Sequence, residues 1–199
     1  MSKKIDNGFE MTSISPGWIK KKVPDSYADD VLKELVLFYV INTPCTDLSS
    51  SGLALSHYGW NKDIWKKGKL KSALFEIADL KSKTTFCVAH KTNEMKKVCK
   101  AANLSKGFQT QRDVERIAMY KNSRYNEFLC ICYHIRNAFA HGRLAMYDYE
   151  NGNDIIFVLE DGVKKNGKFQ VRSRMILKKS TLKTWMDIIK SGMIPSNEQ

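Results

Sequence analysis

The chain has 199 residues and lacks the features of a membrane or secreted protein. Its longest apolar run, residues 35–41, is far shorter than the roughly 20 residues that a membrane-spanning helix requires. Lys3 and Lys4 lie near the N-terminus, but Asp6 and Glu10 follow where a signal peptide needs an apolar stretch. We therefore expect a cytosolic, cytoplasmic protein with no membrane partner and with one hydrophobic core.

Cysteines are few, and their odd number and irregular spacing fit a reducing compartment rather than a disulfide framework. The five are Cys45, Cys87, Cys99, Cys130 and Cys132. Cys130 and Cys132 are two apart on an expected helix, so they point to different sides of it. Cys87, His90 and Cys99 have no regular metal-ligand spacing and no fourth partner. We therefore expect no metal and no other cofactor.

Acidic residues are outnumbered by basic ones, 21 to 33, and the formal net charge is +12. Residues 62–106 contain twelve lysines against four acidic residues, and a second basic stretch covers residues 164–190. Basic surfaces bind nucleic acid because counterions are released from the phosphates. The alternative is a solvated lysine-rich surface without a partner. Plain DNA binding is a weaker interpretation, since no convincing helix-turn-helix signature is present.

The most regular pattern in the chain lies at residues 124–143, where apolar residues recur at helical spacing. The apolar positions are Tyr125, Phe128, Leu129, Cys132, Ile135, Ala138 and Phe139. Gly142 follows the last of them, and glycine is the favoured residue just beyond a helix C-terminus. The pattern predicts a buried helix that ends at His141.

Three polar residues lie together at the end of this helix: Arg136, Asn137 and His141. An arginine can neutralise phosphate oxygens with its forked donors, and a histidine can transfer protons near neutral pH. An amide can orient either of them. The set is therefore suited to a phosphodiester, although a His-Gly pair also serves simply to cap a helix.

The segment Arg136-Asn137-Ala138-Phe139-Ala140-His141, entered from an apolar helix, resembles the signature of the HEPN superfamily. Members of that family are small helical bundles, usually dimeric, and many are metal-independent endoribonucleases. The resemblance implies that Arg136 and His141 are catalytic, that Asn137 supports them, and that two protomers share one site. HEPN toxins that are paired with a nucleotidyltransferase antitoxin often have a tyrosine two residues after the histidine. Here that residue is Arg143, which argues against regulation by nucleotide transfer at this position.

The resemblance implies RNA cleavage by attack of the 2′-hydroxyl, with His141 as acid or base and Arg136 stabilising the phosphate. Arg143 and Lys121 are candidate RNA-binding residues. The implied partners are RNA and a second copy in a homodimer. An antitoxin or regulatory protein is left open, as is a role as a toxin or antiphage defence effector. The alternative is a non-catalytic HEPN-like dimer that binds RNA or a protein.

Helical patterns also occur before the motif helix. A helix is expected from residue 25 or 26 to about residue 42, since Pro44 stops it. Residues 92–103 and 111–120 have helical spacing as well, and the latter leads into the motif helix. Residues 84–90 fit a strand or a helix.

After the motif helix the pattern becomes that of β-structure. Residues 155–159 are apolar and mostly β-branched, and Asp161-Gly162 and Asn166-Gly167 are hairpin turn signals. Ser180 or Thr181 is expected to cap a final helix.

The sequence therefore predicts a mainly α fold, a HEPN-like helical bundle with an added C-terminal β-hairpin and a closing helix. Residues 1–24 are expected to form an N-terminal arm. The remaining residues, 25–199, are expected to form a single domain. Within it, the helical core is expected over 25–142 and the hairpin with its helix over 150–192.

Overall fold

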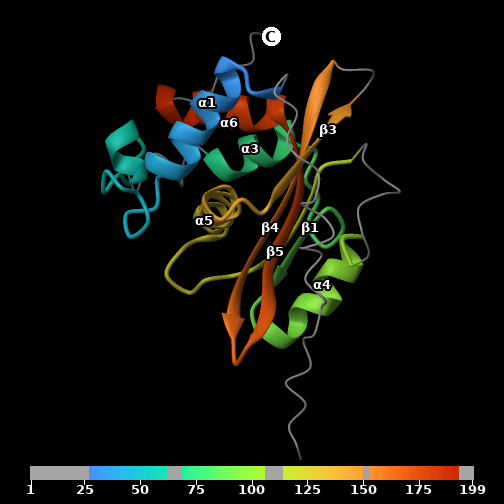
Figure 1. Ribbon diagram of the computed structural model, residues 1–199. Coiled ribbons are helices and arrows are strands. Elements are labelled where there is room, and N and C mark those ends of the chain that lie inside the picture. The colour runs from blue at the N-terminus through green and yellow to red at the C-terminus, as the bar shows by residue number, and fades with distance from the viewer. Residues whose placement is uncertain (1–26, 62–68, 106–113, 150–152, 193–199) are drawn as a thin grey trace, which may run out of the picture.

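The computed structural model describes residues 27–61, 69–105, 114–149 and 153–192, so the predicted arm at residues 1–24 lies outside the described chain. The elements, in order, are α1 (Asp30–Val36), the π-helical turn η2 (Leu37–Ile41), the 3-10 turn η3 (Leu55–Tyr58), α3 (Leu70–Ile77), β1 (Phe86–Ala89), the 3-10 turn η4 (Thr92–Glu94), α4 (Met95–Ala101), β2 (Arg116–Tyr120), α5 (Glu127–Ala140), β3 (Leu144–Tyr149), β4 (Asp154–Lys165), β5 (Lys168–Lys178) and α6 (Lys179–Ser191). The strands form one five-stranded sheet in the order β1-β2-β5-β4-β3 (Figure 1). The prediction of a mainly α, HEPN-like bundle is therefore wrong, because the described chain has an α/β fold.

Strand β2 accounts for a large part of this correction, since a helix was predicted over residues 111–120. The strand lies between β1, which runs parallel to it, and β5, which runs antiparallel. Ile117, Ala118 and Met119 are all buried, because both faces of the strand are covered. A strand buried on both faces has a continuous apolar run, which periodicity cannot distinguish from a helical segment.

The predicted C-terminal hairpin is present and is longer than expected. Strands β4 and β5 pair antiparallel, and their turn is Asn166-Gly167, with φ of +52° and +75°. Two consecutive residues with positive φ are what a type I′ hairpin turn requires. The other turn signal, Asp161-Gly162, instead lies within β4 at a shift of the pairing register. Strand β4 also pairs antiparallel with β3 on its other side, so both strands of the hairpin are part of the central sheet.

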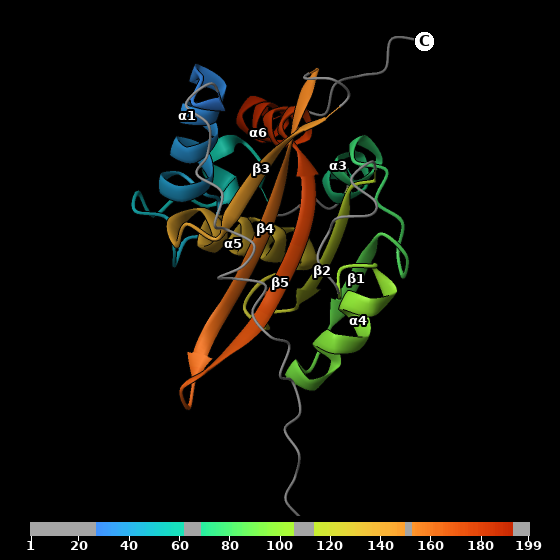
Figure 2. The same cartoon turned by 45° about the vertical axis from the view of Figure 1, so that its right-hand side comes forward.

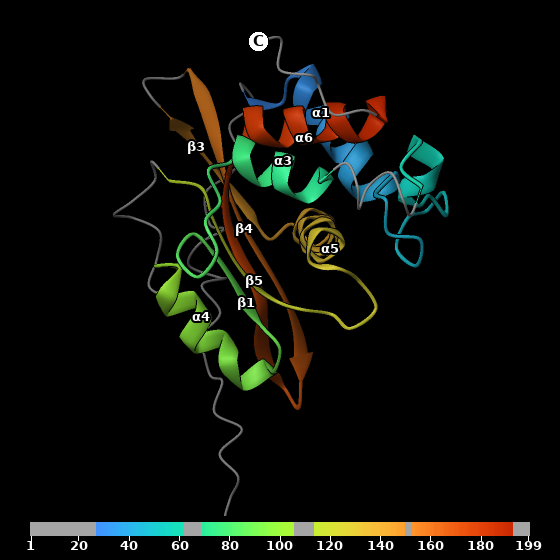
Figure 3. The same ribbon diagram turned by 180° about the vertical axis from the view of Figure 1, so that it is seen from behind.

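Helices cover the two faces of the sheet unequally. Helix α5 contacts β4 and β2, and α6 contacts β4 and β5, on the face that carries Ile117, Leu159 and Met175. Helix α4 packs on the opposite face, against β1, β2 and β5. We name these the α5 face and the α4 face; Figures 2 and 3 show them from two sides. None of the described helices is long and apolar enough to cross a membrane.

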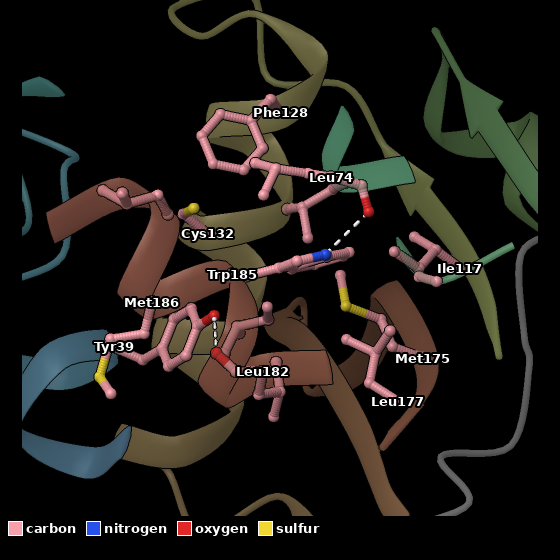
Figure 4. Close-up of a cluster of buried hydrophobic side chains, with 14 of the residues drawn as sticks. Tyr39, Leu74, Ile117, Phe128, Cys132, Met175, Leu177, Leu182, Trp185 and Met186 are labelled. Atoms are coloured by element: carbon pink, nitrogen blue, oxygen red, sulfur yellow. Dashed lines mark hydrogen bonds between the residues drawn. The ribbon is translucent and has the colours of Figure 1, made fainter. Parts of the chain in front are cut away.

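The core under the α5 face is rich in aromatic residues whose polar atoms are satisfied by backbone carbonyls. Trp185 Nε1 donates to Leu74 O at 2.8 Å, and Tyr39 OH donates to Leu182 O at 3.0 Å (Figure 4). Buried indole and phenol groups normally require such a partner. These bonds fix α6 against α3 and η2, and so close the core over the sheet.

Helix α6 begins at Lys179, just before the predicted caps Ser180 and Thr181, and no side chain of its own N-cap residue binds its backbone. Asp154 Oδ1 instead accepts from the backbone N–H of Ser180 at 3.3 Å. Glu115, which precedes β2, binds the residues on either side of Lys179 and Ser180. Its carboxylate accepts from the backbone N–H of Lys178 at 2.7 Å and from the hydroxyl of Thr181 at 2.8 Å. Burial raises the pKa of Glu115 to about 7.

Candidate functional site

Helix α5 carries the predicted catalytic residues, and its bounds confirm the predicted helix. The side chain of Asn126 caps its start by accepting from Leu129 N–H at 2.9 Å. His141 is the C-cap residue, and Gly142 follows with a φ of +61°. That left-handed conformation ends the helix and is accessible to glycine without strain.

The three motif side chains do not converge within one molecule. Arg136 is half-buried, and its Nη1 donates to Asn137 Oδ1 at 3.3 Å. Asn137 is buried, whereas His141 is exposed. The backbone N–H of His141 donates to Asn137 O at 3.0 Å as part of the helix, but within the described chain no side-chain hydrogen bond or ion pair joins the imidazole of His141 to Arg136 or Asn137. The structure therefore brings Arg136 and Asn137 together and leaves the imidazole of His141 free in solvent.

Asn137 belongs to a buried polar network that the sequence analysis did not identify. Its Nδ2 donates to Asp161 Oδ2 at 3.3 Å, and His134 Nδ1 contacts the same oxygen at 2.7 Å. The other ring nitrogen of His134, Nε2, lies 2.8 Å from Tyr120 O. The side chains of His134 and Asp161 are only 1% and 3% exposed. The network therefore joins α5 to both β2 and β4 inside the protein.

The hydrogen-bond partners define where the protons of this network lie. A carbonyl oxygen can only accept, so His134 Nε2 must carry a proton toward Tyr120. The contact between His134 Nδ1 and Asp161 then holds one further proton, shared between an imidazole and a carboxyl group. Asn137 has its NH₂ toward Asp161, which leaves its Oδ1 toward Arg136. Asp161 thus positions Arg136 through Asn137, and the orientation of Asn137 follows from its two partners.

The signal for this network was present in the sequence but incomplete. His134 and Asn137 are three apart and therefore share one face of the motif helix. Their partner Asp161 is far along the chain, in a position that resembled a turn. Only the pairing of β4 with β5 places its carboxyl group under α5.

Of the two predicted RNA-binding residues, Arg143 lies in a defined site on the α4 face, at the start of β3. Its guanidinium lies 3.8 Å from the ring centre of Phe169, and its Nη1 lies 3.7 Å from Glu160 Oε1. Glu160 is fully buried and pairs with Arg174 at 3.1 Å. Lys121 is half-buried just after β2, where its backbone N–H donates to Ala89 O.

Two further pairs of the same kind lie on the α4 face. Arg172 lies 4.7 Å from the ring centre of Tyr120, and Lys178 lies 4.4 Å from that of Tyr149. Lys178 lies on this face because it alternates with the core residue Leu177 of β5, and Tyr120 and Tyr149 pack against the hydrophobic cluster of the same face. Arg172 occupies the irregular position at which the β4–β5 register shifts.

These three cation–ring pairs lie on the part of the sheet formed by β2, β5, β4 and β3. Helix α4 covers the β1 side of the same face, and no other helix of the described ranges lies over β3 and β4 in Figure 2. All six side chains of the pairs are partly exposed. We name this set the cation–aromatic face: Tyr120, Arg143, Tyr149, Phe169, Arg172 and Lys178.

The cysteines do not form a reactive or metal-binding centre. All five are buried thiols without a disulfide. Burial raises the pKa of Cys45 and of Cys99 to about 12, which disfavours the nucleophilic thiolate. Within the described residues, no group of histidines, cysteines and carboxylates is placed to hold a metal ion.

Comparisons with known proteins found no matching family model, no matching curated protein and no matching solved structure. The site is therefore interpreted from its own geometry.

Proposed function

We propose that this protein binds single-stranded RNA on its cation–aromatic face. The observation that carries the proposal is the arrangement of three cations over three aromatic rings on one face of the sheet. Proteins bind single strands by stacking bases on aromatic side chains and pairing phosphates with cations. The face supplies both groups at the same places.

In the pairs Arg172–Tyr120 and Lys178–Tyr149, the cation holds the aromatic ring in one orientation before the RNA binds. A cation over a ring is attracted by the ring quadrupole, which keeps the aromatic surface oriented in the free protein. When RNA binds, a base can stack on the ring while the flexible cation moves to the adjacent phosphate. The buried Glu160 lies beneath and pairs with both Arg174 and Arg143, whereas Arg172 and Lys178 have no ion-pair partner in the described chain and are the cations left for the ligand.

The overall charge supports the same proposal. The formal net charge of +12 favours any polyanion at long range and accelerates its approach. Stacking on the rings then adds a contribution that depends little on base identity. The protein should therefore bind single strands tightly and with modest sequence preference.

Fluorescence anisotropy with a labelled single strand of about 12 nucleotides tests this proposal. Tyr149→Leu and Tyr120→Leu should each weaken binding by about tenfold, since one stacked base contributes about 1–3 kcal/mol. Tyr125→Leu is the matched control, because Tyr125 is half-buried against Tyr133 and belongs to the core cluster of the α5 face. Equal effects of all three substitutions, or no dependence on salt, would exclude the cation–aromatic face as the RNA site.

A metal-independent endoribonuclease centred on His141 is the second candidate. Two observations favour it: His141 is exposed, and Arg136 Nε is buried without a hydrogen-bond partner in the described chain. Asn137 and Asp161 hold Arg136 in place, which would prepare it for a phosphate. The histidine would then act as acid or base, and the 2′-hydroxyl of the RNA would supply the nucleophile.

Incubation of the purified protein with mixed RNA in EDTA separates the two candidates. Cleavage that leaves 2′,3′-cyclic phosphates, and that is lost in His141→Ala, would support the endoribonuclease. His90→Ala is the matched control, since His90 is also exposed but lies at the end of β1. Intact RNA that remains bound to the wild-type protein would support RNA binding alone.

A further inference from the structure

We infer that a second site, at the β1 edge of the sheet, binds a nucleotide with an adenine-type base. The site is a cavity of about 860 Å³ between α3 and α4, with the outer edge of β1 as its floor. Its volume is typical of small-ligand sites. The inference does not depend on RNA binding, because the cavity involves none of the residues of the cation–aromatic face.

The floor of the cavity presents one backbone N–H and one backbone C=O, both of Val88, to a ligand. Thr85 O and Ala89 O accept from β2-side N–H groups, so the alternate residue Val88 points its N–H and C=O away from the sheet. Neither group has a partner among the described residues. At the neighbouring positions, Phe86 and His90, outward-pointing backbone groups already take part in hydrogen bonds within the protein.

Local bonds close the edge before and after this residue. Phe86 donates to Lys81 O and accepts from Lys83 N–H, both at 2.9 Å. The N–H of His90 donates to the carboxylate of Glu94 at 2.9 Å. An added peptide strand needs several free positions in succession, and only one remains here. The edge therefore suits a ligand that needs a single donor and a single acceptor.

A planar base with a donor next to an acceptor meets this requirement, as the adenine edge does. The acceptor would take the N–H of Val88, and the exocyclic amine would donate to its C=O. Phe75 from α3 and Val98 from α4 line opposite sides of the cavity and provide apolar walls for the base.

Cations at the rim suit the phosphates. Lys83 and Lys97 line the cavity without an ion-pair partner in the described chain, whereas Lys71 pairs with Glu127. Lys83 also has a φ of +69°, a conformation that glycine adopts with less strain. The turn that gives Lys83 this conformation is closed by its backbone N–H, which donates to Phe86 O at 2.9 Å and so fixes the residue beside the cavity.

Isothermal titration calorimetry with ATP and with tripolyphosphate tests the two parts of the site. Val88→Pro removes the outward N–H, and proline is tolerated on edge strands where that group is not used by the sheet. The substitution should weaken ATP binding by about tenfold, the value of a lost hydrogen bond, and leave tripolyphosphate binding unchanged. Lys83→Gly should weaken both ligands and relieve backbone strain. Lys96→Ala is the matched control, since Lys96 is exposed on α4 but does not line the cavity.

Purine riboside triphosphate, which lacks the exocyclic amine, gives a readout with the unaltered protein and should bind about tenfold more weakly than ATP. Thermal unfolding checks that each variant is folded. Equal binding of ATP, tripolyphosphate and purine riboside triphosphate would overturn the inference, because the base would then not be recognised. Tighter binding of a glutamate-rich octapeptide, lost in Val88→Pro, would instead assign the edge to an acidic peptide and also overturn it.

Discussion

At the residue scale, the buried network around Asp161 is the clearest example of a polar group whose role depends on a distant partner. The carboxyl group contacts His134 at 2.7 Å and Asn137 at 3.3 Å, and it is almost fully buried. Breaking such a pair leaves a polar group without a partner in a low-dielectric interior. The network therefore holds α5 in a single orientation on the sheet.

Asp161→Ala should lower the free energy of unfolding by about 3 kcal/mol, because the imidazole of His134 loses its partner. Urea unfolding measures this change. Lys164→Ala, at an exposed position of the same strand, is the control and should change the free energy of unfolding by less than about 0.5 kcal/mol. Similar values for the two variants would mean that the network contributes little to stability.

Glu115 should make stability depend on pH. Burial raises its pKa from 4.5 to about 7, so the folded protein binds a proton that the unfolded chain has already lost between these values. The free energy of unfolding should therefore fall as the pH rises from about 4.5 to about 7, by up to about 3 kcal/mol. Below this window both states are protonated, and the penalty is absent.

Glu115→Gln isolates this effect, because a neutral amide of similar shape cannot ionise. Urea unfolding of both proteins at about pH 5 and about pH 8 gives the comparison. The variant should gain stability relative to the wild type at the higher pH. A difference between the two proteins that stays constant with pH would show that Glu115 does not titrate in this range.

At the scale of the element, the two residues at the end of α5 are expected to differ in their contribution to stability: Gly142 ends the helix, whereas the side chain of His141 is exposed. Gly142 has a φ of +61°, and no atom lies near the position that a Cβ would occupy, so backbone strain alone opposes a side chain. Gly142→Ala should therefore lower the free energy of unfolding by about 1 kcal/mol. His141→Ala should lower it by less, since the exposed imidazole makes no hydrogen bond within the described chain.

Thermal unfolding of the two variants checks this order. The comparison also makes His141→Ala a suitable variant for the RNA cleavage assay, because lost activity would then reflect lost chemistry. A larger destabilisation by His141→Ala than by Gly142→Ala would contradict this assignment and indicate that His141 is structural.

At the scale of the whole molecule, the predicted homodimer stays a prediction. One chain offers one exposed His141 and one half-buried Arg136, so an endoribonuclease would gain an acid, a base and a second cation from an isologous interface. Light scattering at working concentration should detect the dimer. Polyanions should strengthen it and high salt should weaken it, because the interface would bring two arginines together.

Subunit mixing tests the shared site directly. Arg136→Ala and His141→Ala proteins should each be inactive, and their mixture should regain partial RNA cleavage. Each mixed dimer keeps one intact histidine and one intact arginine from different chains. An active protein that is strictly monomeric would rule out the shared-site mechanism.

The sequence determined the elements whose signals are local. Three such elements are the helix that ends at His141, its glycine cap and the hairpin turn at Asn166-Gly167. Each depends on residues that are close together in the sequence. The basic character of the chain is likewise a property of composition. These features were predictable because neighbouring residues alone define the energies involved.

Only the tertiary structure decided the fold class and the arrangement of the site. Residues 116–120 became a strand because β1 and β5 were available to pair with them, and pairing partners are not encoded in apolar periodicity. Asp161 became the partner of His134 only when β4 crossed beneath α5. Likewise, Tyr120 and Arg172 meet only because β2 and β5 are adjacent in the sheet. The contacts that define the candidate sites are long-range, and they exist only once the sheet has formed.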